Sequence, residues 1–319
     1  MDANGAPLKS VIGFKNWAIA ILPTLFFTVL FFLPVSYILR ETGSHSFSPL
    51  REIIFTATFW SIAWFTLWQA LLSTVFSILF AFPGIYLFTK YQFKGRRFLR
   101  SLVTIPFVLP TVVVGSSFIA VFSKFNFDSG IFNLRHSVWA ILIAHIFLNA
   151  SIAIRIVSTF WEGLSETPES QSRILGSGAI GTFFKITLPR LRPALFSAGT
   201  TIFLFCITSF GIILILGGPK NSTIETEIWR QAVWRSDIGA ASTFALIQLT
   251  FVILLSSILI KGEKKTSLKE NLSTKKKRKP RNSILALHLI YLFLLFGLPV
   301  YILVAVSYTH LTLPTILLV

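Results

Sequence analysis

The sequence predicts an all-α membrane protein: a polytopic helical bundle with about six spans and the first span of a second half. Of the 319 residues, 54% are hydrophobic and only 13% are charged, and the mean hydropathy is +0.74. The surface of a soluble domain of this size would be far more polar. Seven segments of roughly spanning length contain no Asp, Glu, Lys or Arg: 17–39, 59–88, 102–122, 138–154, 194–216, 240–260 and 284–305.

The basic residues alternate between two sides of this arrangement. If the N-terminus is cytoplasmic, 22 Lys and Arg residues fall on inner segments and 7 on outer ones. Because cytoplasmic loops carry the excess of positive charge, this alternation predicts a cytoplasmic N-terminus. We therefore attribute the net charge of +17 to cytoplasmic segments that lie near anionic lipid headgroups, and we expect no nucleic-acid partner.

The order of the segments divides the chain into five parts. Residues 1–58 hold an N-terminal cytoplasmic segment, the first span and an outer loop, and residues 59–262 hold a core with a cytoplasmic loop at 160–193. Residues 263–282 form a basic linker, and residues 283–305 the first span of a second half. Residues 306–319 are expected to be a non-native tail, because 306–315 resemble translated sequencing-adapter read-through; the alternative is an outer loop before an eighth span. We expect the chain to be an N-terminal fragment, and the long 59–88 span to tilt or break near Pro83.

The loop at 160–193 is predicted to form two short helices joined by glycine. Thr167-Pro168-Glu169 reads as a helix start, with Thr as N-cap and Glu near the positive end of the helix dipole. Gly176 tolerates the positive φ that reverses the chain. Ile186-Thr-Leu-Pro189 then returns the chain to the membrane. Glu169 and Arg173 lie four residues apart and are expected to pair with each other or with a partner protein.

Glu169, Gly176 seven residues later, and Ile186-Thr-Leu-Pro189 after nine more residues resemble the cytoplasmic coupling loop of binding-protein-dependent ABC importer permeases. Segment 99–115, with its core at 105–115, resembles the third span of permeases for ferric iron or thiamine, and 217–219 with 222–231 resemble their outer loop. The family's usual Glu-Ala-Ala is here Glu169-Ser170-Gln171. The resemblance implies a coupling loop built from Glu169, Ser170, Gln171, Arg173, Gly176, Ile186, Leu188 and Pro189.

The same resemblance implies a transport subunit of the bacterial cytoplasmic membrane that is not an enzyme. The expected partners are two ABC ATPase subunits, an extracytoplasmic solute-binding protein and the lipid bilayer. No cofactor is expected in this chain, since ATP and Mg²⁺ would be bound by the ATPase, and the sequence contains no G-x-x-x-x-G-K-[ST] motif. Ferric iron is the first expectation for the solute, with thiamine, polyamine or sulfate as alternatives. The alternative from another class of transporter is an ion-gradient-driven carrier. This alternative is disfavoured because the predicted spans contain no carboxylate.

Two further sets of residues are candidates for contact with the solute or its binding protein. A membrane span broken by proline is tolerated where the span lines a cavity or is buried in protein. The candidates for a translocation path are therefore Pro106, Pro110, Gly115 and Ser116. The alternative is a kink that serves helix packing. Mixed charges beside aromatic residues suit protein docking, which marks Glu225, Glu227, Trp229 and Arg230; an interfacial Trp belt is the alternative. Buried polar residues such as His145 are expected to be structural, and no metal site is expected.

Overall fold

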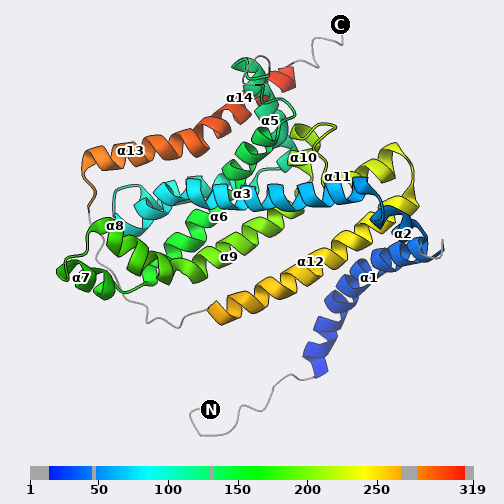
Figure 1. Cartoon of the computed structure of the whole chain (residues 1–319), viewed down its shortest axis with the longest axis horizontal. Helices are drawn as coiled ribbons and strands as arrows, with labels where there is room; N and C mark the ends of the chain where they lie inside the picture. Colours follow the sequence, from blue (N-terminus) through cyan, green and yellow to red (C-terminus); the bar gives the residue numbers. More distant parts are fainter. Residues whose placement is uncertain (1–13, 45–47, 129–132, 267–278, 313–319) are drawn as a thin grey trace. The chain divides into compact units, whose positions relative to one another are not determined.

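The computed structural model describes residues 14–44, 48–128, 133–266 and 279–312, which form helices joined by short connections (Figure 1). The chain divides into two compact units, residues 1–56 with 228–247 and residues 57–227 with 248–319. Most of the predicted basic linker, at 267–278, and the end of the predicted tail, at 313–319, lie outside the described residues.

The first unit contains α1 (Phe14–Ser44), α2 (Ser48–Ile54), the π-helix η3 (Arg230–Trp234) and the start of α12 (Ile238–Thr266). The second contains α3 (Ala57–Lys90), α4 (Arg96–Val108), α5 (Thr111–Lys124), α6 (Val138–Gly163), α7 (Thr167–Ile174), α8 (Ala179–Thr182), η2 (Phe183–Thr187), α9 (Leu188–Ile207), α10 (Gly211–Leu216), the larger part of α12, α13 (Asn282–Leu292), η4 (Phe293–Gly297) and α14 (Leu298–Thr312); α11 (Ile224–Trp229) lies at the boundary.

The described helices confirm an all-helical membrane architecture. Six of them are long and apolar enough to cross a bilayer, and a seventh is added if α4 and α5 are counted as one bent span. Two expectations need correction in detail. Of the expected tilt or break near Pro83, the break does not occur: the long helix α3 continues through Pro83, because contacts with neighbouring helices let a membrane helix tolerate proline. The fifth predicted span ends at Ile207, and Gly211–Leu216 is the separate short helix α10.

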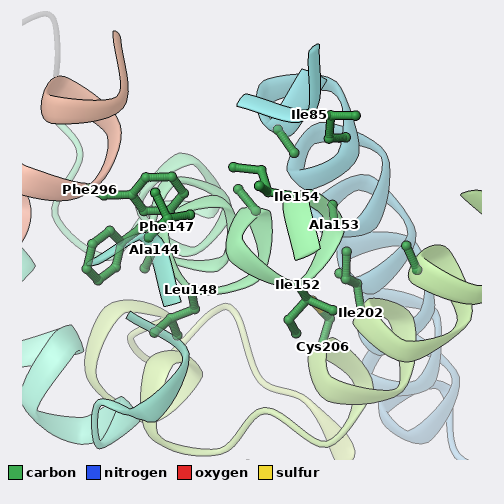
Figure 2. Packing of buried hydrophobic residues seen from close by; sticks show 14 of the residues in the cluster. Ile85, Ala144, Phe147, Leu148, Ile152, Ala153, Ile154, Ile202, Cys206 and Phe296 are labelled. Carbon is green, nitrogen blue, oxygen red and sulfur yellow. The ribbon is translucent and has the colours of Figure 1, made fainter. Parts of the chain in front are cut away.

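The core of the second unit is built around α6, which packs against α3 and α9. Fully buried alanines on α6 allow neighbouring helices to approach closely. Figure 2 shows Ile152 beside Ile202 and Cys206 of α9, and Phe147 beside Phe296 of η4, whose ring centroids are 6.5 Å apart. The segment predicted to start a second half therefore packs on this core through η4.

The third predicted span is broken, as its prolines indicated. Helices α4 and α5 meet at an angle of 97°. Leu109 is extended, with ψ 139°, because a residue that precedes proline is driven out of the helical region. Pro110 therefore sets the bend, whereas Pro106 remains inside α4 and its carbonyl accepts a hydrogen bond from the Leu109 amide at 3.2 Å.

A second break follows α9, and buried polar side chains surround it. Gln69 Nε2 donates to the Cys206 carbonyl at 3.1 Å. The His145 ring joins Ser73 of α3, with Nδ1 and Oγ 2.8 Å apart, to Ser209 in the break, with Nε2 and Oγ 2.9 Å apart. These contacts satisfy polar groups that lipid would leave without partners, so they agree with the structural role expected for His145.

The short helix α10 packs on α5 through a glycine from each helix. A Cβ atom at Gly115 of α5 would lie 2.9 Å from the Ile215 Cβ of α10. A Cβ atom at Gly211 of α10 would lie 2.4 Å from Thr111 Oγ1 and 2.7 Å from the Val112 backbone nitrogen. The contact therefore leaves no room for a larger residue at Gly211 without moving backbone.

We expect Gly211→Ala to lower the free energy of unfolding by about 1–3 kcal/mol, because the added methyl group overpacks a contact that includes backbone. Thermal unfolding in detergent measures the loss. The matched control is Gly199→Ala in α9, where a Cβ would make ordinary contacts at 3.6 and 3.8 Å. Equal melting temperatures for the two variants would contradict this account of the α5–α10 contact.

Candidate functional site

Residues 167–187, which we call the hook, connect α6 to α9 through α7, α8 and η2. The hook lies at one end of α3, α6 and α9 (Figure 1). Gly176 has a φ of +82°, so the chain reverses at the residue where the sequence predicted it. The predicted helix–glycine–helix pattern is confirmed, with Glu166 and not Thr167 at the N-cap position. Ile186 and Thr187 belong to η2, which runs directly into α9 with Pro189 in its first turn.

Glu169 is bound by other residues of this chain. Of the two pairings that the sequence suggested for it, the one with Arg173 is not formed, and the one with a partner protein is untested. Lys90 at the end of α3 donates to Glu169 Oε2 at 2.7 Å, and Thr187 Oγ1 donates to Glu169 Oε1 at 3.0 Å. The residue is only 9% exposed. Glu169 thereby connects the start of the hook, the end of the hook and the end of α3.

Opposing effects act on the Glu169 carboxyl group. Burial by itself would raise its pKa, but the hydrogen bond and the charge of Lys90, with contributions from Thr187 and Trp161, hold the pKa below the ordinary 4.5. The carboxylate is therefore ionised at neutral pH. The stability that its ion pair contributes is present above pH 4.5 and is lost only as the pH falls through the lowered pKa.

A second group of charges lies beside the hook and was not identified from the sequence. Glu162, near the end of α6, accepts hydrogen bonds from Arg96, at 2.8 Å, and from Arg100, both on α4. Arg96 also donates to the Phe88 carbonyl at 2.7 Å. The available signal in the sequence was Glu162 after the fourth predicted span and the basic residues Arg96 and Arg100 before the third. These bonds fix the ends of α3, α4 and α6 relative to one another.

The tip of the hook exposes large apolar side chains. Exposure reaches 83% for Ile174, 85% for Leu175 and 76% for Ile180, and Phe184 of η2 is 60% exposed. Of the residues predicted for coupling, Ser170, Gln171, Arg173 and Gly176 are exposed around this tip, while Ile186, Leu188 and Pro189 are partly buried at the start of α9. The sequence interpretation missed the apolar tip, although an Ile-Leu pair before glycine in a polar loop was a visible signal.

The four residues predicted for a translocation path have different environments. Pro106 is buried, whereas Pro110 and Ser116 are exposed. Gly115 faces Ile215 of α10 and serves helix packing. The structure therefore supports the packing alternative for Gly115, and the bend at Pro110 is the feature that matches the expectation of a broken span.

The residues predicted to dock a binding protein are divided by their burial. Glu227 is 4% exposed, so its side chain is not presented to a partner in this structure, contrary to expectation. Glu225 is partly buried and accepts a hydrogen bond from Gln248. Burial raises its pKa, which this hydrogen bond offsets only in part. Trp229 and Arg230 are partly exposed, and the Trp229 ring lies 5.3 Å from that of Trp234.

Comparison with known families matches residues 73–262 to the family described as "Binding-protein-dependent transport system inner membrane component". This range contains the whole hook and most of the helical core.

Curated relatives include transport proteins for two solutes. The thiamine transport system permease protein of Brucella abortus is 30% identical over 227 residues, which is 67% of this chain and 41% of that protein. The Haemophilus influenzae thiamine permease is 28% identical over 249 residues, 73% of this chain and 46% of that protein. The sulfate transport system permease protein of Escherichia coli is 27% identical over 240 residues, 72% of this chain and 86% of that protein. The chain spans less than half the length of the thiamine permeases it matches.

Among solved structures, a chain of a bacterial alginate ABC transporter, in complex with a periplasmic protein that binds an alginate pentasaccharide, superposes with a TM-score of 0.64. The match covers 81% of this chain and 96% of the other, at 14% sequence identity. At this identity the likeness establishes the fold alone.

The left-handed turn at Gly176 generates a testable expectation for the hook. Gly176→Val should destabilise the turn by about 1–2 kcal/mol, because a side chain in this conformation is strained. Amide hydrogen exchange over residues 167–187 should then be about tenfold faster. Gly178→Val is the control, since Gly178 has φ −64° and ψ 166° and has open space around it. If the two variants exchanged at the same rate, the turn would not depend on the positive φ.

Proposed function

Because the chain belongs to the family of binding-protein-dependent transport system inner membrane components, the permeases of ABC importers, we propose that it couples a partner ATPase to solute uptake. The observation that carries this proposal is the hook. It joins two helices of spanning length, it is bound to a third through Glu169 and Lys90, and it exposes an apolar tip. A helical tip of this kind suits insertion into an apolar groove of a partner, in the way that amphipathic helices dock.

The proposed mechanism uses two faces of the membrane. A solute-binding protein delivers the solute on the outer side, and two ATPase subunits that bind ATP and Mg²⁺ close on the inner side. The hook lies on the inner side, with the N-terminus, an orientation that the distribution of basic residues supports. Closure of the ATPase subunits displaces the hook, and the helices attached to it shift between inward-open and outward-open arrangements.

We propose thiamine as the solute, with sulfate as the second candidate. Two of the relatives described above are thiamine permeases, and the best identity, 30%, is to one of them. The sulfate permease is the relative that the match covers most completely, at 86% of its length. Ferric iron, the first expectation from the sequence, has no support among these relatives. An ion-gradient-driven carrier is disfavoured by the family match.

Uptake by the full polypeptide, reconstituted with a partner ATPase and a solute-binding protein, tests both parts of this proposal. Labelled thiamine should accumulate in proteoliposomes only with ATP, and excess unlabelled sulfate should not compete. Uptake driven by an ion gradient without the ATPase would contradict the importer assignment. ATP-driven uptake of sulfate in place of thiamine would retain the importer and change the solute.

A substitution at the tip tests the role of the hook. Leu175→Glu should reduce both ATPase binding and ATP-driven uptake at least about tenfold, because a charge would have to enter an apolar groove. Co-purification of the ATPase and uptake measure the two effects. Gln92→Glu adds the same charge at an exposed position in the connection between α3 and α4 and should leave both unchanged. Full ATPase binding by the Leu175 variant would exclude the tip as the docking surface.

A further inference from the structure

We propose that Lys90 is a positioning residue that fixes the hook to the end of α3, so that the hook and α3 move as one body. The inference rests on the proposed function, because only a chain driven by an ATPase would transmit a displacement of the hook. Lys90 lies outside the coupling loop at 160–193, and the sequence did not identify it as a site residue.

Lys90, at the end of α3, contacts α6, α7 and the connection between them. Its Nζ lies 2.7 Å from Glu169 Oε2 of α7 and 3.6 Å from Glu166 Oε1 just before α7. The same ammonium group lies over the Trp161 ring of α6, 5.3 Å from the ring centroid. The side chains of Lys90 and Glu169 are only 19% and 12% exposed, so water screens their attraction less than it would at an open surface.

Glu169 carries this attachment to both ends of the hook. Its second oxygen accepts the Thr187 hydroxyl at 3.0 Å, at the last residue of η2. Arg190 strengthens the closure by donating to the Ser165 carbonyl at 2.9 Å. Neither end of the hook can move far without the other, so displacement of the tip reaches Lys90 through one carboxylate.

A pocket lies beside the ion pair. Its volume is about 250 Å³, and its lining includes Lys90, Trp161 and Glu169 as well as Ile180 and Phe184 of the far arm of the hook. Ile180 and Phe184 therefore face this pocket, whereas Phe183 of η2 packs on Phe82 of α3 and Trp161 of α6, with ring centroids 5.5 and 6.3 Å apart. The far arm is held to the bundle by this aromatic contact and by the bonds at the two ends of the hook.

The helix that Lys90 ends is continuous and reaches the opposite end of the unit. Near that end, Thr66 Oγ1 accepts the backbone N–H of Ile224 at 3.1 Å, at the start of α11. The 24 residues from Thr66 to Lys90 correspond to about 36 Å of helix. A rigid α3 attached at Lys90 therefore connects the hook to the start of α11.

The test uses the complete transporter in proteoliposomes and measures solute moved per ATP hydrolysed, together with the amount of ATPase bound. Lys90→Met and Glu169→Gln should each lower solute per ATP about tenfold while the ATPase remains bound, because the tip is intact. Lys90→Arg should retain coupling, since it keeps the charge. The control is Lys94→Met, at an exposed position in the connection that follows α3.

The double variant Lys90→Met with Glu169→Gln keeps the test free of a simple folding defect, because it leaves no buried carboxylate without its cation. It should couple no worse than either single variant. Normal coupling by Lys90→Met, additive losses in the double variant, or loss of ATPase binding by Lys90→Met would each overturn the inference. If the unaltered protein bound no ATPase and moved no solute with ATP, the proposed function would fail instead.

Discussion

Backbone groups inside a bilayer must find partners within the protein, and the main features of this chain follow from where its helices stop. Between α4 and α5 the helical bonding ends at Pro110, and between α9 and α10 it ends after Ile207. At the second break, Gln69 supplies a donor to the Cys206 carbonyl, and His145 links Ser73 to Ser209. The second break is therefore held by side chains from α3 and α6, which are themselves unbroken.

Charged groups perform the corresponding task at the end of the bundle where the hook lies. Two acidic residues there, Glu162 and Glu169, are each bound by basic residues from the end of α3 or the start of α4. Half-buried ion pairs add little net stability, but the removal of one member leaves the other charge without compensation. Such pairs consequently fix the relative positions of helix ends more than they raise stability. This suits the hook, which must keep its orientation when a partner protein displaces it.

The sequence predicted the elements that depend on local patterns and missed those that depend on tertiary contacts. Apolar segments without charges located the spans, and Pro168 and Gly176 located the start and the reversal of the hook. The partner of Glu169 could not be read from spacing, because Lys90 lies 79 residues away in the chain and Arg173 lies one turn away. Glu227 was expected outside for a similar reason: a charged residue in a loop is usually solvated, but here tertiary packing buries it. The separation of α10 from α9 was hidden because the whole segment 194–216 is uncharged and long enough for one span.

The hook combines an apolar tip with a charged attachment, and these respond to different surroundings. Association of Ile174 and Leu175 with an apolar surface would carry a negative heat-capacity change and weaken on cooling. The attraction between Lys90 and Glu169 is screened only weakly by salt, because both side chains are largely buried. Acid below the lowered pKa of Glu169 therefore weakens the attachment of the hook to α3, whereas the apolar tip carries no group that titrates.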